Sequence, residues 1–138
     1  MQSKNIYVDT NIILDICDDK RVCFRQSLDR VAFYQKSGCE LFINSDSYAN
    51  LFYILKSQSK YDLSYCLDKL KLIQTIFTLV SIENEDVNQA IKMCEDNSIA
   101  SSDYEDIMQY ICAKKVNAKV ILTNDKKFVD LDIELERT

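Results

Sequence analysis

The sequence predicts an α/β protein: a three-layer α/β/α sandwich around a mostly parallel sheet of four to five strands. Short apolar runs with β-branched residues alternate with longer stretches of helical periodicity, as in folds whose strands are joined by helices. Two of the runs, 6–8 and 119–123, are followed closely by an aspartate, Asp9 and Asp125. The carboxyl ends of strands border the crevice where such folds bind ligands, so these two aspartates are expected to meet there.

The first strand is predicted at residues 5–8, within which residues 6–8 are continuously apolar. A strand without polar alternation is expected at the centre of a sheet, covered on both faces. Asp9 ends the run, and Thr10 and Asn11 offer short polar side chains that can cap the next helix. Taken alone, Asp9 is most simply a cap or turn residue.

Periodicity and capping residues place the other elements. Helices are expected at residues 12–17, 22–37, 48–57, 63–77, 83–96 and 104–116. Further strands are expected at residues 40–43, 78–82 and 119–123, with a short edge strand at 132–135. Gly38, the one glycine of the chain, is expected to follow the second helix in a left-handed conformation. With 138 residues and 47% hydrophobic content, we expect residues 1–138 to form a single domain.

Composition excludes several kinds of chemistry. The chain has no histidine, 17 basic residues and 22 acidic residues, with a net charge of −5. Without histidine, Ser-His-Asp catalysis, Cys-His catalysis and His-ligated zinc are excluded. An acidic protein is also not a general binder of the phosphate backbone, so contact with nucleic acid needs a local basic patch, a metal or a partner.

The cysteines indicate a reducing compartment. The six are dispersed and form no CxxC pair, and most lie in helical patterns beside apolar residues, which is typical of buried free thiols. The sequence carries no secretory segment after Met1 and no apolar run of membrane-spanning length. We therefore expect a cytoplasmic protein that does not contact a membrane.

A second acidic cluster begins the last predicted helix. Asp103 and Asp106 are three residues apart, so they share one helix face, whereas Glu105 is expected to point elsewhere. Each acid has a simple structural explanation: Asp103 as an N-cap, Glu105 and Asp106 as first-turn acids favoured by the helix dipole, and Asp125 as a turn residue. Two like charges at this spacing repel each other, and a cation would relieve that repulsion.

Taken together, these carboxylates and Asp9 form a set of ligands made only of oxygen. Hard divalent cations such as Mg²⁺ or Mn²⁺ prefer such a set and keep several waters for substrate phosphates. A metal held in this way lowers the pKa of a bound water and stabilises the charge that develops when a phosphodiester is cleaved. The sequence therefore predicts a site for Mg²⁺ or Mn²⁺.

The pattern of motifs resembles the PIN-domain family, which includes the VapC-like toxin ribonucleases of bacterial toxin–antitoxin pairs. The resemblance covers essentially the whole chain in length and element order. It rests on Val-Asp-Thr-Asn at residues 8–11, Asp-Tyr-Glu-Asp at 103–106 and Thr-Asn-Asp at 123–125. The first motif is weak alone, but the second followed by the third is fairly specific.

The resemblance implies a role for individual residues. Asp9, Asp106 and Asp125 match the first, third and fourth metal-binding acids of the family, and Asp103 matches an additional acid found in a subset. Thr123 matches the hydroxyl at the end of the strand. We expect substrate contacts from Asn11, Ser45, Thr123 and Lys126.

The second acidic position departs from the family pattern. Many PIN nucleases carry a glutamate there, on the helix after the second strand, and this chain has Asn50. A subset of the family likewise carries asparagine. An amide can accept a bond from a metal-bound water or contact the substrate, but it is neutral and cannot act as a base. Asn50 is equally well explained as an ordinary polar helix residue. Asp46 lies four residues earlier and is expected to act as a cap.

The resemblance implies a metal-dependent endoribonuclease that cleaves single-stranded RNA. It also implies a toxin that a cognate antitoxin neutralises and that forms a homodimer. Asp9, Asn50, Asp106 and Asp125 are the predicted catalytic residues. One alternative is a PIN-fold module that binds RNA or protein without cleavage, which Asn50 and the acidic net charge favour. Another is a small α/β domain whose carboxylates are only caps, in which Asp→Asn changes would leave metal affinity unchanged.

Overall fold

The fold is built around β1 (Asn5–Val8), the central strand of a five-stranded sheet. The structure is a computed structural model that describes residues 4–96 and 103–138. The strand order is β3-β2-β1-β4-β5, and every adjacent pair is parallel. The other strands are β2 (Glu40–Asn44), β3 (Thr78–Val80), β4 (Val120–Leu122) and β5 (Glu134–Glu136). The predicted α/β fold class is confirmed.

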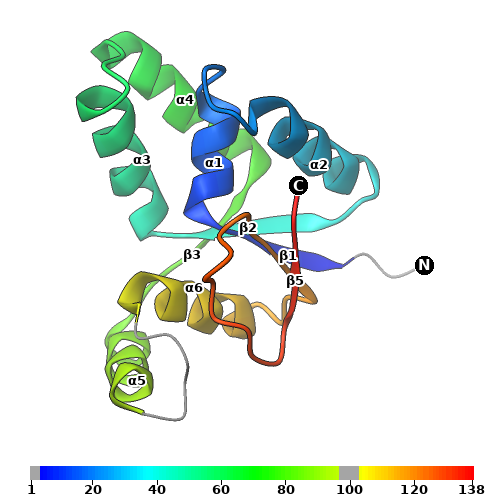
Figure 1. Ribbon diagram of the computed structural model, residues 1–138, viewed down its shortest axis with the longest axis vertical. Coiled ribbons are helices and arrows are strands. Elements are labelled where there is room, and N and C mark those ends of the chain that lie inside the picture. The colour runs from blue at the N-terminus through cyan, green and yellow to red at the C-terminus, as the bar shows by residue number, and fades with distance from the viewer. Residues whose placement is uncertain (1–3, 97–102) are drawn as a thin grey trace.

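Helices cover both faces of the sheet (Figure 1). The helices are α1 (Thr10–Cys17), α2 (Phe24–Lys36), α3 (Asp46–Ser57), α4 (Leu63–Ile76), α5 (Asn84–Glu95) and α6 (Tyr104–Lys115). Side chains from α1 to α4 share one hydrophobic core with Ile6 and Val8 of β1, and side chains from α5 and α6 share the other with Tyr7. Because alternate residues of a strand point to opposite faces, a continuously apolar β1 fills both cores.

The register of β1 against β4 determines which residues meet at the carboxyl ends. Tyr7 pairs with Ile121 and Val8 with Leu122, so the next residues, Asp9 and Thr123, emerge side by side. The N–H of Asp9 donates to the carbonyl of Leu122 at 2.9 Å, which extends the ladder by one step. The predicted meeting of strand ends is therefore produced by adjacent parallel strands.

Several predicted boundaries shift by a few residues. Helix α1 begins at Thr10, two residues earlier than predicted, with Asp9 at its N-cap position. The expectation that Thr10 and Asn11 cap this helix is therefore wrong: both lie inside it. Helix α3 also begins early, because the Asn44 side chain accepts a hydrogen bond from the N–H of Asp46 at 2.9 Å.

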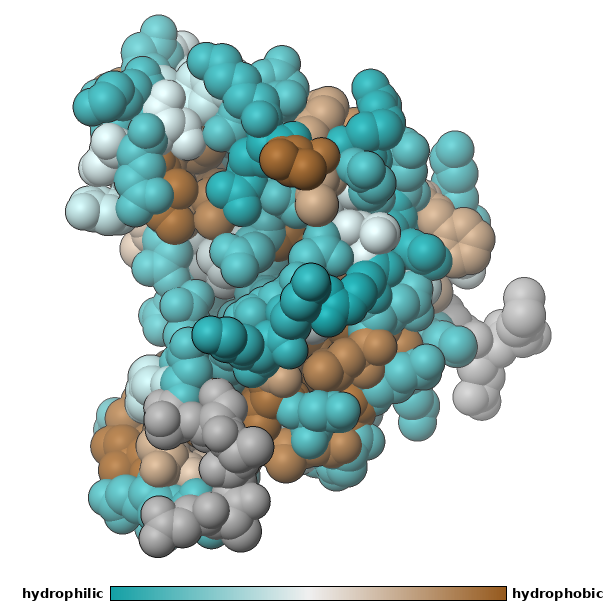
Figure 2. Space-filling view, in the orientation of Figure 1, coloured by the Kyte–Doolittle hydropathy of each residue, from teal (hydrophilic) through white to brown (hydrophobic). Residues whose placement is uncertain are grey.

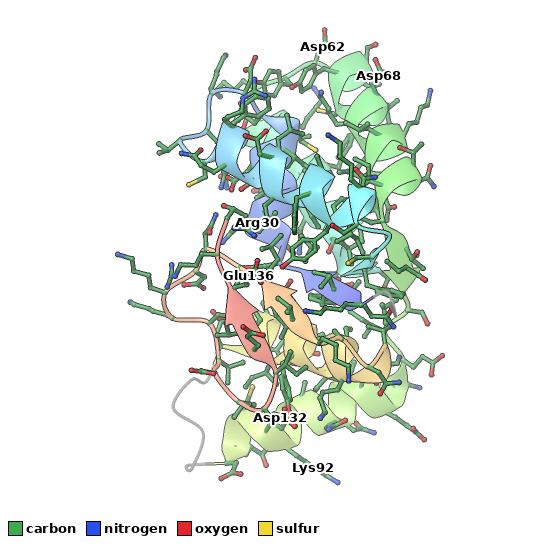
Figure 3. The ribbon with its side chains drawn as sticks, turned by 90° about the vertical axis from the view of Figure 1, so that its right-hand side faces the viewer. Arg30, Asp62, Asp68, Lys92, Asp132 and Glu136 are labelled. Atoms are coloured by element: carbon green, nitrogen blue, oxygen red, sulfur yellow. The ribbon has the colours of Figure 1, made fainter. Side chains whose placement is uncertain are left out.

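Other local expectations agree with the structure. Gly38 has a φ of +78°, the left-handed conformation predicted after α2. The edge strand lies at Glu134–Glu136 and is joined to α2 by a salt bridge of 3.0 Å between Glu136 and Arg30, whose side chains lie near each other in Figure 3. Ser101 and Ser102, expected to help cap α6, lie outside the described residues. None of the described helices is long and apolar enough to cross a membrane.

Candidate active site

Asp9 is held in place by two side chains from distant parts of the chain. Its Oδ1 accepts a hydrogen bond from Gln109 Nε2 at 2.8 Å, and its Oδ2 accepts one from Thr123 Oγ1 at 2.7 Å. The residue is 3% exposed and makes no side-chain capping bond to α1. Asp9 therefore occupies the N-cap position of α1, but its carboxylate is held chiefly by Gln109 and Thr123, so it is more than a helix cap.

Gln109 is a site residue that the sequence reasoning missed. It lies on α6, is 1% exposed, and also accepts a hydrogen bond from the N–H of Thr10 at 3.2 Å. Both ends of its amide are thus used to join α6 to the start of α1. A polar residue between apolar neighbours, three positions after Asp106 and hence on the same helix face, was the available signal.

Asp106 is buried near the start of α6, among other acids. Burial, followed by the charges of Asp103, Asp9, Asp125 and Glu105, raises the pKa of Asp106 to about 7. Burial also raises the pKa of Asp9 above its ordinary range, although hydrogen bonds, chiefly those from Thr123 and Gln109, act in the opposite direction. The charges of Asp9 and Asp125 thus act on Asp106, as their predicted grouping requires. We call these three residues, together with Asp103 and Glu105, the acidic crevice.

Asp103 and Glu105 have different places in the acidic crevice. Asp103 is the N-cap of α6, where its Oδ1 accepts from the N–H of Glu105 at 2.9 Å and of Asp106 at 3.3 Å. Glu105 was expected to point away from the face shared by Asp103 and Asp106, and it lines a separate cavity that neither of them lines. Burial and the charges of Asp9, Asp103 and Asp46 raise the pKa of Glu105.

Asn50 lines a cavity of about 200 Å³ beside the acidic crevice. The same cavity is lined by Glu105 and Asp46, which face Asn50 from α6 and from the start of α3. Thr10, Asn44, Tyr104 and Met108 complete its walls. The neutral amide at position 50 therefore shares its surroundings with two carboxylates that the sequence reasoning had set aside.

The predicted substrate contacts divide into two groups. Thr123 is 2% exposed, and its hydroxyl donates to Asp9 and accepts from the N–H of Asp125 at 3.1 Å. The Ser45 hydroxyl accepts from the N–H of Ile82 at 3.3 Å. Thr123 therefore supports the site from inside, whereas Ser45 joins the end of β2 to the segment after β3. Asn11 and Lys126, in contrast, are exposed.

The surface around the site is polar. In Figure 2, hydrophilic side chains form a band across the middle of the molecule, between the two helical layers and over the segment that joins β4 to β5. That segment begins with Thr123 and Asp125, where Asp125 accepts from the N–H of Lys127 at 2.9 Å. The site therefore lies at a polar junction between the two layers.

The donor set fits a hard divalent cation in its chemistry. In the described chain, no Lys or Arg forms a salt bridge with Asp9, Asp106 or Asp125. Burial first, and then the charges of Asp103, Asp9 and Asp125, raise the pKa of Asp106. Such uncompensated negative charge is what a cation would neutralise. Within residues 4–96 and 103–138, however, no three acidic or cysteine side chains already converge at metal-binding spacing.

Comparison with known proteins identifies relatives along the whole chain. The PIN domain family model matches residues 6–134. Ribonuclease VapC1 from Aquifex aeolicus (strain VF5) is 33% identical over 138 residues, an alignment that covers 100% of this chain and 93% of that protein.

Solved structures share the fold at lower sequence identity. Mycobacterium tuberculosis VapC20, described as a toxin that cleaves the sarcin–ricin loop, has a TM-score of 0.72 at 10% identity, covering 89% of this chain and 92% of that one. VapBC from Salmonella typhimurium, bound to DNA, has a TM-score of 0.68 at 16% identity, covering 99% and 98%. VapBC2 from Rickettsia felis, bound to a promoter DNA fragment, has a TM-score of 0.66 at 19% identity, covering 96% and 98%.

Proposed function

The chain belongs to the PIN-domain family, and from this premise we propose that it is a toxin ribonuclease that cleaves single-stranded RNA with Mg²⁺ or Mn²⁺. The observation that carries the proposal is the acidic crevice, which groups carboxylates from the ends of β1 and β4 and from the start of α6. Within the described residues, Asp9, Asp106 and Asp125 form no salt bridge with a lysine or arginine. The relative at 33% identity, a ribonuclease by name, supports the same activity.

Asp9, Asp106 and Asp125 would hold the metal, with Asp103 as an auxiliary ligand. When bound, the metal supplies a water of lowered pKa and stabilises the negative charge that develops on the phosphate. The protein supplies position. Gln109 and Thr123 fix both oxygens of Asp9, and such supporting bonds keep a ligand in the orientation that binding requires.

Asn50 would orient the substrate or the attacking water. Its amide offers both a donor and acceptors, and it lines the cavity next to the acids. Glu105 and Asp46 keep that cavity acidic. The alternative is a non-catalytic binding module, which the neutral Asn50 supports. That alternative does not explain why carboxylates that repel one another are grouped in the crevice.

We also propose a protein partner and a compartment. An antitoxin would neutralise the chain, since two of the structural neighbours are VapBC assemblies, and the chain would form a homodimer. We place its action in the cytoplasm, where its six cysteines would stay reduced; all six are unpaired in the structure.

The test is cleavage of a mixed pool of single-stranded RNA with Mn²⁺, Mg²⁺ or EDTA. Wild type is compared with Asp9→Asn and Asp106→Asn, and with Asp68→Asn as a matched control on α4, distant from the crevice (Figure 3). We expect metal-dependent cleavage by wild type and by the control, lost in the two crevice variants. Absence of cleavage by folded wild-type protein with either metal would contradict the proposal.

A further inference from the structure

A second cavity adjoins the acidic crevice and contains basic side chains. Its volume is about 490 Å³, and it is lined by Lys20 and Arg21 from the loop between α1 and α2, by Asn11 and Asp15 of α1, and by Asn124 and Asp125. Asp125 belongs to both the crevice and this cavity. An RNA strand whose scissile phosphate lies at the acids can therefore extend directly into it.

We propose that this cavity is a subsite for a backbone phosphate that flanks the scissile bond, with Lys20 and Arg21 as its ligands. The inference rests on the proposed ribonuclease function and names the part of the substrate that this surface contacts. It also addresses a problem of charge: a chain with a net charge of −5 and an acidic crevice needs local cations to attract a polyanion.

Arg21 is positioned in advance of binding. Its Nε donates to Asp15 Oδ1 at 2.8 Å, and the other oxygen of Asp15 accepts from the Ser27 hydroxyl at 2.7 Å. Asp15 is 5% exposed, whereas the Arg21 side chain is 35% exposed. A guanidinium has five N–H donors, so anchoring through Nε leaves its terminal nitrogens for a ligand, and the fixed fork suits phosphate.

Lys20 supplies a second positive charge, and its ammonium forms no salt bridge within the described chain. Its ammonium lies 5.4 Å from the centre of the Tyr61 ring, a contact that leaves its N–H donors free for an anion. This matters because the charge of Arg21 is largely offset by Asp15. Lys20 would therefore provide the attraction, and Arg21 the directed hydrogen bonds.

The loop that carries both residues is fixed to the rest of the protein. Asp18 accepts from the N–H of Lys20 at 3.1 Å and from the Tyr61 hydroxyl at 2.7 Å, and its carbonyl accepts from the N–H of Arg21 at 3.1 Å. Its remaining carboxylate oxygen accepts from Ser59 at 3.2 Å. A subsite held by such contacts loses little conformational freedom when it binds a ligand.

The opposite wall is also fixed. The side chain of Asn124 donates to Thr138 Oγ1 at 2.7 Å and accepts from the N–H of Thr138 at 3.0 Å. The Thr138 hydroxyl lies 3.2 Å from that of Ser27, the residue that bonds Asp15. One hydrogen-bonded chain thus connects the two walls, so Asn124 shapes the cavity while Lys20 and Arg21 provide its donors.

The experiment measures binding of a short single-stranded RNA by fluorescence anisotropy across a range of salt concentrations. All proteins carry Asp106→Asn to prevent cleavage. The protein with this substitution alone is the parent, and it is compared with proteins that also carry Lys20→Gln or Arg21→Lys. Lys92→Gln is the matched control, since Lys92 is exposed on α5 at the far end of the molecule (Figure 3). Arg21→Lys keeps a cation beside Asp15, so the fold is retained and only the guanidinium donors are lost.

We expect Lys20→Gln to weaken binding by about 3- to 10-fold and to make the plot of log affinity against log salt shallower by about 0.7, the change for one lost phosphate contact on a single strand. Arg21→Lys should weaken binding with a smaller change in slope, because charge is kept. Replacing one linkage by a neutral methylphosphonate at the matching position should abolish the difference between parent and Lys20→Gln.

If Lys20→Gln and Arg21→Lys bind RNA with the same affinity and the same salt dependence as Lys92→Gln, the subsite proposal is overturned and the ribonuclease proposal stays intact. If none of the proteins binds RNA and the protein that retains Asp106 does not cleave it, both the subsite proposal and the ribonuclease proposal are overturned. Unchanged RNA binding would also indicate that the basic pair serves another ligand, such as an acidic protein segment, and would contradict the inference.

Discussion

Acidic side chains occupy two contrasting environments in this molecule, with opposite effects on their pKa. At the contact between α5 and α6, Asp86 accepts from Lys115 Nζ at 2.7 Å and from the N–H of Glu83 at 2.9 Å. Burial alone would raise the pKa of Asp86, but these bonds lower it below its ordinary range. In the acidic crevice, burial and neighbouring carboxylates raise the pKa of Asp106 to about 7 instead.

The difference lies in the partners rather than in the residue type. Asp132 repeats the first arrangement: a hydrogen bond from Lys114, followed by one from Tyr110, lowers its pKa. Asp86 and Asp132 are therefore each paired with a lysine, whereas Asp9, Asp106 and Asp125 form no salt bridge with a basic side chain in the described part of the chain. This contrast supports the proposal that the crevice binds an external cation, and it predicts some loss of stability when that cation is absent.

The largest expected effect separates the two regions by activity. Asp106→Asn should reduce RNA cleavage by at least about 100-fold, because it would remove one of the proposed metal ligands. Asp86→Asn should leave cleavage near the wild-type rate and lower stability by about 1 kcal/mol, since the pair with Lys115 is partly exposed. The measurements are cleavage rate and denaturant unfolding. Similar effects of the two variants on cleavage would break the contrast.

The next largest effect concerns the support of Asp9. Gln109→Ala leaves Asp9 Oδ1 and the N–H of Thr10 without their buried partner, so we expect a loss of about 2–4 kcal/mol in the free energy of unfolding. Cleavage at saturating Mn²⁺ should fall about 10-fold. Gln74→Ala, at an exposed position of α4, is the control and should change neither quantity.

A smaller effect is expected in the pH dependence of stability without metal. Asp106 has a folded pKa of about 7 and an unfolded value of about 3.9, so the folded state binds the proton more tightly. Its contribution to the free energy of unfolding is fully present below pH about 4 and is lost as pH rises to about 7. Because solvent in the crevice screens the charges, we expect a loss of about 1–2 kcal/mol.

Denaturant unfolding of wild type and Asp106→Asn between pH 4 and pH 8 measures this loss. The variant should lack the loss of stability with rising pH that Asp106 causes in wild type. Saturating Mg²⁺ should restore stability to wild type above pH 7, because a ligand that binds only the folded state stabilises it. If the free energy of unfolding of wild type rises with pH through this range, as that of the variant does, the crevice carboxylates do not destabilise one another.

The smallest effect is expected at position 50. Asn50→Glu adds a carboxylate to the cavity already lined by Asp46 and Glu105, so Mn²⁺ affinity should rise several-fold while metal-free stability falls by about 0.5–1 kcal/mol. Asn50→Gln has the same length without the charge and should do neither. Weaker Mn²⁺ binding by Asn50→Glu would show that the cavity does not communicate with the metal site.

Local features of the sequence predicted most of the fold. Residues 6–8 indicated a central strand, Gly38 a left-handed turn, and Asp103 a helix cap, each because the signal lies within a few residues of its consequence. Thr10 was wrongly expected to cap α1. Asp9 takes the N-cap position because its carbonyl accepts the first helical hydrogen bond, from the N–H of Ile12 at 3.0 Å.

The site was predicted only in part, for a physical reason. The acids could be identified from their motifs, but Gln109 binds Asp9 across 100 residues of sequence, a contact fixed by the packing of α6 against the start of α1. The cavity with Lys20 and Arg21 likewise depends on how the loop after α1 meets the end of β4. Such contacts come from tertiary packing and leave no short-range pattern.

The most direct test of the acidic crevice as a metal site is calorimetric titration of Mn²⁺ into metal-free wild type, Asp106→Asn and Asp86→Asn. We predict that wild type and Asp86→Asn bind Mn²⁺ with equal affinity and that Asp106→Asn loses at least about 10-fold. If wild type binds no Mn²⁺, or if Asp106→Asn binds it as tightly as Asp86→Asn does, the central claim is contradicted.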